Sequence, residues 1–211
     1  MTLISRHFCL GLATLMAAAL AGCLDLKPVR STTRYFVLSE LAAGGGTTSG
    51  NSTHFVIGIA PTKIPAYLAH DGIAVRHDAN EVEYLQNAVW AERLDKGVQR
   101  VVAANLETLL PGVQIRLSSW RVENIQAELH LAVQQFEVNQ SGEGTLQVDW
   151  RILSPGDARV LKAGQYRSTQ KGPGPEDNPQ GATATLSKLA AEFSRELARA
   201  MPEAVQSAGG K

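Results

Sequence analysis

Cys23 is the residue whose neighbours point most clearly to a chemical modification. It follows Leu20-Ala21-Gly22, and the resulting Leu-Ala-Gly-Cys sequence matches the bacterial lipobox. The preceding chain has the parts of a secretory signal peptide: a short basic part with Arg6 and His7, an apolar part over residues 10–20, and small residues at the cleavage point. We therefore expect residues 1–22 to be a lipoprotein signal peptide that is removed before Cys23.

The chemistry of cysteine explains why this residue type stands at the cleavage point. The thiol of Cys23 can take a diacylglycerol group through sulfur, and the amine freed by cleavage can take an N-acyl chain such as palmitate. Each buried methylene contributes roughly 0.8 kcal/mol to membrane binding, so three acyl chains are enough for a lasting anchor. The apolar part of the signal is too short to span a bilayer. The alternative is an ordinary signal peptide that ends near a cysteine by chance, which would leave Cys23 unmodified.

The residues after Cys23 predict a destination and a tether. Leu24 follows the cysteine, whereas an Asp at that position favours retention at the inner membrane in enterobacterial lipoproteins. We therefore expect the outer membrane, with the protein on its periplasmic face, although Asp25 one position later weakens this prediction slightly. Residues 23–33 have little apolar periodicity, which indicates a lipidated tether to the folded part.

Composition excludes some classes of protein. The chain carries 20 Lys and Arg residues against 20 Asp and Glu residues, a balance that does not favour a nucleic-acid surface. Cys9 leaves with the signal and Cys23 takes the lipid, and these are the chain's 2 cysteines. The mature domain is therefore expected to contain no disulfide and to depend on its hydrophobic core.

Residue patterns typical of catalysis are sparse. His70-Asp71 and His77-Asp78 are two His-Asp pairs, but no further Cys or His lies at a spacing that would complete a metal site. The chain has no Gly-x-Ser-x-Gly nucleophile elbow, no phosphate-binding glycine loop and no dinucleotide fingerprint. We predict a protein that is not an enzyme, with no catalytic residue and no metal. An exported hydrolase that uses Ser, His and Asp is an alternative, which His70→Ala or His77→Ala would test.

Six residues are candidates for partner binding, because apolar, aromatic and Arg side chains often anchor interfaces. They are Ile64, Pro65, Tyr67, Leu68, Trp90 and Arg93. The first four belong to an unusually apolar predicted loop, and the last two precede a predicted helix. Two alternatives stay open: the loop folds back over a sheet edge, and Trp90 packs as a hydrophobic staple before the helix.

The spacing of apolar residues predicts the secondary structure. The predicted strands are 35–38, 54–60, 73–76, 82–85, 113–117, 129–133, 146–152 and 160–168. Amphipathic helices are predicted over 94–110 and 186–200, the second ended by Pro202. Stretches rich in Gly or Pro at 42–52 and 172–179 predict loops.

This order of elements favours an α+β fold, with a mainly antiparallel sheet and two amphipathic helices packed on one face. Strands 73–76 and 82–85 are expected to form a hairpin, and Trp150 is expected in the core. We predict a single domain over 34–203 after the lipidated tether, followed by a flexible tail over 204–211.

Several separated segments carry a family resemblance in addition to the lipobox at Cys23. They are Tyr-Phe-Val-Leu at 35–38, Ile-Pro-Ala-Tyr-Leu at 64–68, Asn-Ala-Val-Trp-Ala-Glu-Arg-Leu at 87–94, Arg-Val-Val-Ala-Ala-Asn-Leu at 100–106, Gln-Phe-Glu at 135–137, Asp-Trp-Arg at 149–151 and Leu-Ser-Lys-Leu at 186–189. In their order and spacing these segments resemble the PqiC (YmbA-type) family of membrane-integrity and ABC-transport auxiliary lipoproteins. The Gly-rich stretch at 42–52 corresponds to a variable loop.

The resemblance implies an outer-membrane lipoprotein subunit of an MCE-type intermembrane lipid transport system that supports membrane integrity. It would dock a periplasm-spanning MCE-domain bridge protein (PqiB-like) and, through it, an inner-membrane PqiA-like protein. The family has no catalytic residues to transfer, so only Cys23 carries over, and the subunit would not hydrolyse ATP. A homo-oligomeric ring would suit a docking collar. The alternative is a periplasmic lipid or small-ligand carrier that holds its cargo under the two helices.

Overall fold

The computed structural model describes residues 32–42, 54–117 and 120–209 of the 211-residue chain. Cys23 and nearly all of the predicted tether lie outside these residues, and the described helices and strands belong to the compact unit Thr33–Lys211. No helix within the described ranges is both long enough and apolar enough to cross a membrane.

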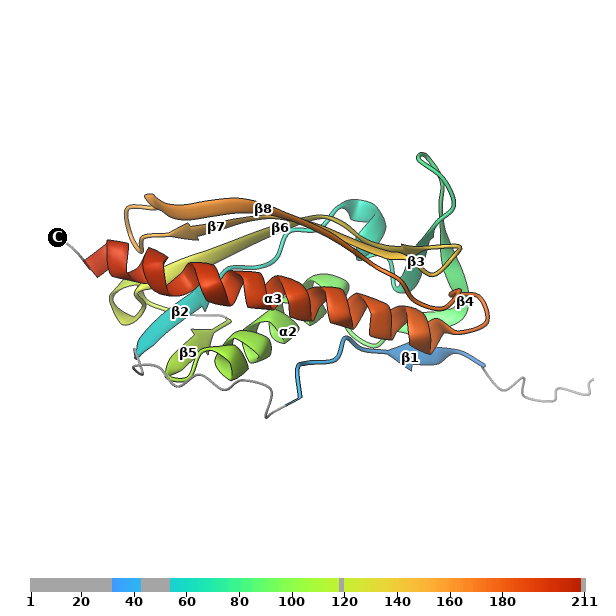
Figure 1. Cartoon of the computed structure of the whole chain (residues 1–211), viewed down its shortest axis with the longest axis horizontal. Coiled ribbons are helices and arrows are strands. Elements are labelled where there is room, and N and C mark those ends of the chain that lie inside the picture. Colours follow the sequence, from blue (N-terminus) through green and yellow to red (C-terminus); the bar gives the residue numbers. More distant parts are fainter. Residues whose placement is uncertain (1–31, 43–53, 118–119, 210–211) are drawn as a thin grey trace, which may run out of the picture. The chain divides into compact units, whose positions relative to one another are not determined.

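Within the described residues, one sheet of eight strands forms the framework of the domain (Figure 1). The strands are β1 (Arg34–Phe36), β2 (Phe55–Ile59), β3 (Gly72–Arg76), β4 (Val82–Trp90), β5 (Val113–Arg116), β6 (Ala127–Asn139), β7 (Gly144–Leu153) and β8 (Val160–Gln170). The order across the sheet is β1-β4-β3-β6-β2-β5, and β7 and β8 continue from the other edge of β6. One edge of β6 is therefore shared, with β2 at its start and β3 at its end.

The α+β class is confirmed, but the expectation of a mainly antiparallel sheet is partly wrong. The β3–β4, β6–β7 and β7–β8 pairs are antiparallel, and the first of these is the predicted hairpin. The β1–β4, β2–β5, β2–β6 and β3–β6 pairs are parallel. The reason is that the chain does not reverse between β2 and β3: both run along β6 in the same direction, and the chain leaves the sheet between them.

Strand β6 continues past the point where its sequence pattern breaks. The expected strand at 129–133 ended before Phe136, whose position does not fit the alternation. The pairing with β7 shifts at Gln134, which is one extra residue and forms a β-bulge. The bulge restores the alternation, so Phe136 and Val138 face the core and the strand continues.

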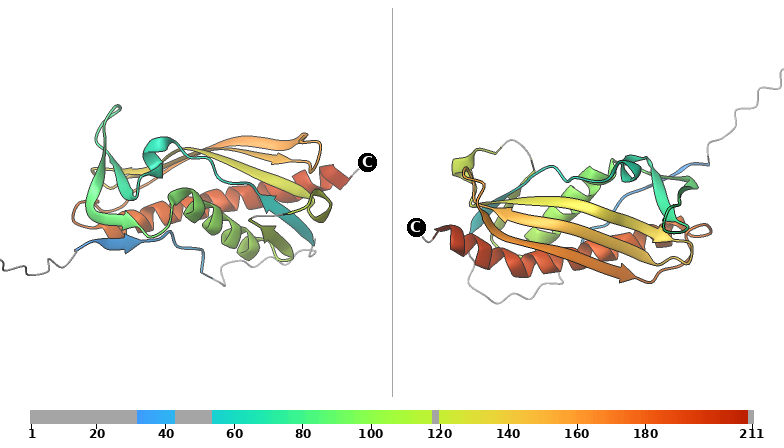
Figure 2. Two further views of the ribbon diagram at one scale, coloured as in Figure 1. Left: turned by 180° about the vertical axis from the view of Figure 1, so that it is seen from behind. Right: turned by 90° about the horizontal axis from the view of Figure 1, so that it is seen from above.

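Two helices cover one face of the sheet and leave the opposite face of β6, β7 and β8 open (Figure 2). Helix α2 (Leu94–Leu109) packs against α3 and β5, and α3 (Pro179–Gly209) packs against β6, β7 and β8. Their apolar stripes meet the inward side chains of the strands, among which Trp150 is buried as expected. The result is one continuous hydrophobic core, which confirms the predicted single layer of helices on one face.

The expected end of the second helix at Pro202 is wrong, because α3 continues to Gly209 with Pro202 inside it. A proline inside a helix removes one backbone hydrogen bond and costs about 3 kcal/mol. Core contacts on both sides of the proline offset this cost, since Met201 and Ala204 are buried.

Candidate functional site

The N-terminal segment, residues 34–41, connects the domain to the part of the chain that carries Cys23. It begins as β1, which pairs in parallel with the end of β4. The amide of Ala91 donates to the Phe36 carbonyl at 2.8 Å, and the chain then continues along α2 and α3 with Leu38 buried. This segment therefore joins the folded domain to the preceding part of the chain.

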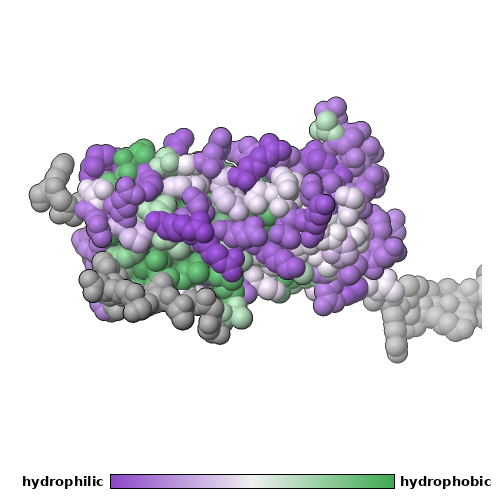
Figure 3. All heavy atoms as spheres, in the orientation of Figure 1, coloured by the Kyte–Doolittle hydropathy of each residue, from purple (hydrophilic) through white to green (hydrophobic). Residues whose placement is uncertain are grey.

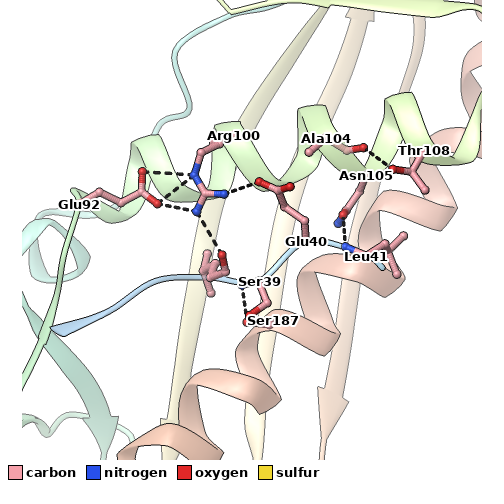
Figure 4. A network of polar contacts seen from close by, with 10 residues as sticks. Ser39, Glu40, Leu41, Glu92, Arg100, Ala104, Asn105, Thr108 and Ser187 are labelled. Carbon is pink, nitrogen blue, oxygen red and sulfur yellow. Dashed lines mark hydrogen bonds and ion pairs between the residues drawn. The ribbon is translucent and has the colours of Figure 1, made fainter. Parts of the chain in front are cut away.

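Arg100 on α2 fixes the middle of the N-terminal segment (Figure 4). Its guanidinium donates to the Leu38 carbonyl at 3.1 Å and pairs with the Glu40 carboxylate at 2.5 Å. On its other side it pairs with Glu92 at 2.6 Å. The hydrogen bond that Arg100 donates to Glu92 raises the pKa of Arg100 above its ordinary value, so the guanidinium remains charged while it binds the segment.

Asn105 and Ser187 bind the backbone amides of the same segment. The Asn105 side chain is 0% exposed; its oxygen accepts from the Leu41 amide at 2.7 Å, and its nitrogen donates to Ser194 on α3 at 3.1 Å. Ser187 Oγ accepts from the Ser39 amide at 3.0 Å (Figure 4). Because α2 and α3 both supply polar side chains, the segment is bound in the angle between the two helices.

The predicted partner-binding loop lies where the chain leaves the sheet between β2 and β3. Residues 66–69 form the 3-10 turn η1 (Ala66–Ala69). Leu68 is 2% exposed and belongs to the core, so the expectation of an exposed side chain is wrong there. Ile64 and Tyr67 are half-buried and pack against the core, and Pro65 is also half-buried. The alternative in which this loop folds back over the sheet fits these positions.

Tyr67 is held by a buried carboxylate. Glu137 on β6 is 2% exposed; it accepts from the Tyr67 hydroxyl at 2.8 Å and pairs with Arg76 on β3 at 2.7 Å. Burial raises the pKa of Tyr67 well above its ordinary value, and the hydrogen bond to Glu137 acts in the same direction. Together Tyr67, Glu137 and Arg76 join the loop to two strands, which is a structural role.

The other two predicted partner residues separate in the structure. Trp90 is 8% exposed and packs in the core at the end of β4, so it is not a surface anchor. Arg93 is exposed and pairs with Asp95 at 3.0 Å at the start of α2. Trp90 is buried and Arg93 is exposed, and a single sequence does not reveal this difference in burial.

The two His-Asp pairs make local contacts. His70 stacks on Tyr84 with ring centroids 3.8 Å apart and accepts from the Gly72 amide. His77 contacts Glu83 on the neighbouring strand at 3.1 Å. No group of three His, Cys, Asp or Glu residues that could bind a metal occurs in the described parts of the chain.

An apolar surface near the ends of the two helices was not identified from the sequence. Figure 3 shows hydrophobic residues gathered beside the C-terminal half of α3. Leu109, Leu110 and Ala198 line a hollow of about 280 Å³ there, next to Arg195 and Arg199.

The roles of Asn105 and Ser194 were also not predicted from the sequence, although a polar residue inside the apolar stripe of a helix is a sign of a buried contact.

The described residues form an α+β domain whose N-terminal segment is bound between two helices. The family model described as "ABC-type transport auxiliary lipoprotein component" matches residues 36–198. The chain belongs to this family, and it is therefore an auxiliary lipoprotein of transport with a place in the cell envelope. The family's description names a transport component and not an enzyme.

Individual proteins agree with this assignment. The intermembrane transport lipoprotein PqiC of Escherichia coli (strain K12) is 24% identical over 190 residues, which cover 89% of this chain and 97% of that protein. A solved structure of a protein from Xanthomonas campestris matches with a TM-score of 0.69 at 14% identity, covering 85% of this chain and 100% of the other. A solved structure of an uncharacterized protein matches with a TM-score of 0.67 at 18% identity, covering 80% and 98%. The two structures show the shared fold.

Proposed function

We propose that this protein is the outer-membrane lipoprotein subunit of an MCE-type intermembrane lipid transport system, anchored by acyl chains on Cys23 and facing the periplasm. It docks the periplasm-spanning MCE-domain bridge protein, PqiB-like, and through it works with a PqiA-like inner-membrane protein to support membrane integrity. The role is non-catalytic. The observation that carries the proposal is the family match over residues 36–198 in a chain that also has a lipobox.

The anchored N-terminal segment supports a role at a fixed membrane position. A docking subunit must resist separation of its lipid anchor from its folded domain when the partner is bound. The side chains of Arg100, Asn105 and Ser187 bind the segment within a few residues of its entry into the domain. Such contacts transmit the attachment at Cys23 directly to the two helices.

The long edge strand β8 supports partner binding. Within the described residues β8 (Val160–Gln170) pairs only with β7, so its other edge presents unpaired backbone groups. Such an edge can accept an added strand from another chain. We therefore include this edge, together with exposed Arg93, among the surfaces that a bridge protein or a neighbouring copy in a ring would contact.

The alternative of a periplasmic lipid or small-ligand carrier has less support. A cargo under the two helices would have to displace side chains such as Leu106, Leu189 and Phe193, which are buried in one continuous core. Native mass spectrometry of the purified lipoprotein would test it, because a bound lipid other than the anchor would revive this alternative.

The docking proposal is tested by site-specific photocrosslinking in intact cells. A photoreactive residue at Gln165, exposed on β8, is compared with one at Lys188, exposed on α3. Capture of an MCE-domain protein from Gln165 and not from Lys188 supports docking at the β8 edge. Capture of no MCE-domain protein from either position, while Cys23 is acylated, contradicts the proposal.

A further inference from the structure

The open face of the sheet contains a hollow that the docking role does not use. It has a volume of about 360 Å³ and is lined by residues of β6 and β7. Figure 2 shows that the helices lie on the other face of these strands. Its polar lining comes from Lys63, His130, Gln134, Asp149 and Arg151. A volume at the lower end of the range for ligand pockets suits a small polar group.

The register of the strands explains why a hollow forms here. Lys63 forms an isolated parallel bridge with Ala132 on β6, and Ala132 pairs with Asp149 on β7. Paired residues point to the same face of a sheet, so Lys63, Ala132 and Asp149 form one row across it. The methyl group of Ala132 is the floor of the hollow, and the longer side chains on both sides are its walls.

Lys63 is fixed although it lies outside the named strands. Its amide donates to the Leu131 carbonyl at 3.0 Å, and its carbonyl accepts from the Val133 amide at 2.9 Å. The next row of the sheet pairs His130 with Arg151. Three basic side chains from three separate segments therefore surround the same floor.

These charges are only partly neutralised inside the protein. Neither Lys63 nor Arg151 has an ion-pair partner among the described residues, whereas His130 contacts Glu128 at 3.2 Å. Asp149 lies across Ala132 from Lys63, on the same face of β7 as Arg151; its Oδ2 accepts from Gln134 at 3.1 Å, and its Oδ1 is buried with no hydrogen-bond partner among the described groups. The hollow thus has basic side chains on both sides of β6, Lys63 on one side and Arg151 on the other, with the carboxylate of Asp149 beside Arg151.

We propose that this hollow binds a phosphoethanolamine group, with its phosphate among Lys63, His130 and Arg151 and its ammonium at Asp149. A tetrahedral phosphate presents oxygens in several directions and can accept from all three basic side chains at once, whereas a flat carboxylate is satisfied by one guanidinium. The ammonium pairs with the Asp149 carboxylate through Oδ2, whose hydrogen bond with Gln134 is exposed. The same chemistry occurs in a lipid headgroup and in the free compound.

Titration calorimetry on the full-length lipidated protein in a non-phospholipid detergent tests this site with four probes. They are O-phosphoethanolamine, inorganic phosphate, ethanolamine and dihexanoylphosphatidylethanolamine. We expect O-phosphoethanolamine to bind more tightly than either inorganic phosphate or ethanolamine. Tighter binding of the short-chain lipid than of O-phosphoethanolamine identifies a lipid headgroup as the source, and the reverse identifies the free compound. Equal affinity for inorganic phosphate and O-phosphoethanolamine overturns the proposal.

Variants separate the two halves of the site. Lys63→Gln and Arg151→Gln are each expected to weaken O-phosphoethanolamine binding about tenfold, the size of one lost charge-assisted hydrogen bond. Asp149→Asn is expected to weaken O-phosphoethanolamine but not inorganic phosphate. The matched control Lys171→Gln, on an exposed loop, should change neither. Unchanged binding in Arg151→Gln, with unchanged thermal unfolding, overturns the proposal, and capture of an MCE-domain protein by the same variants would show that the docking role is independent.

Discussion

The buried side chain of Asn105 accepts a hydrogen bond from the backbone amide of Leu41 at 2.7 Å, across 64 positions of sequence. The same side chain donates to Ser194 on α3. One residue therefore joins both helices to the N-terminal segment.

Asn105→Ala should lower the free energy of unfolding by about 1–3 kcal/mol, because the Leu41 amide and the Ser194 hydroxyl would each lose a buried partner. Urea unfolding measures the change. Asn124→Ala is the control, since Asn124 is exposed in the short turn η2 (Val122–Asn124) and should have almost no effect. An equal small effect of both substitutions would mean that Asn105 does not stabilise the segment.

Arg100→Gln should loosen the N-terminal segment without unfolding the domain. The substitution removes the ion pairs with Glu40 and Glu92 and weakens the hold on the Leu38 carbonyl. Hydrogen exchange should become about tenfold faster for the amides of 38–41, the size of one lost charge-assisted hydrogen bond. Arg93→Gln, which breaks the pair between the exposed Arg93 and the buried Asp95 at the start of the same helix, should leave that exchange unchanged.

Gly164→Ala should destabilise the sheet, because Gly164 lies directly opposite Trp150 on β7. A Cβ atom at this position would be 2.6 Å from Cζ2 of Trp150, whose ring is buried and cannot move away freely. The expected loss is about 1–3 kcal/mol in the free energy of unfolding. Gly174→Ala is the matched control, since the nearest atom there is 3.7 Å away. A loss no larger than that of the control would contradict the close approach of Trp150.

Tyr67 should make the free energy of unfolding depend on pH in the alkaline range. Its pKa in the folded protein is raised above the ordinary value of 10.0, first by burial and then by Glu137. The unfolded chain therefore loses this proton first as the pH rises, so the contribution of Tyr67 is complete below about pH 10 and is lost above it. Urea unfolding should show wild type more stable than Tyr67→Phe at pH 8, with the difference shrinking at pH 11.

Tyr166→Phe is the control for this pH dependence. Burial also raises the pKa of Tyr166, but this residue packs on Phe193 and has no contact with Glu137. In an absorbance titration of tyrosinate, Tyr67→Phe should remove the component that titrates at the highest pH. Retention of that component in Tyr67→Phe would show that the hydrogen bond to Glu137 is not formed.

The sequence predicted the elements that depend on local spacing. The helix over 94–110, the hairpin of β3 and β4 and the buried Trp150 are all present, since each is encoded by apolar periodicity over a few residues. The parallel pairs were not predicted because strand pairing is a long-range property: β2 and β3 both pair with β6, which follows them in the sequence only after β4, α2 and β5. Pro202 predicts the end of a helix, but the core contacts of α3 continue beyond it.

The candidate sites were harder to predict than the elements. Leu68 and Trp90 were expected to be available to a partner, but only the three-dimensional packing shows that both are core residues. Conversely, Arg100 gave no signal as the residue that binds the N-terminal segment, because Glu40 and Glu92 reach it from separate parts of the chain. Lys63 and Asp149 lie in one row only through the register of the strands.

The most direct test of the central claim combines the anchor and the partner in one sample. Full-length protein with a C-terminal tag is crosslinked in living cells, and mass spectrometry then identifies the modification on Cys23 and the captured proteins. A triacylated Cys23 together with an MCE-domain protein is the predicted result. An acylated Cys23 without such a partner would contradict the docking role, and an unmodified Cys23 would contradict the account of the anchor itself.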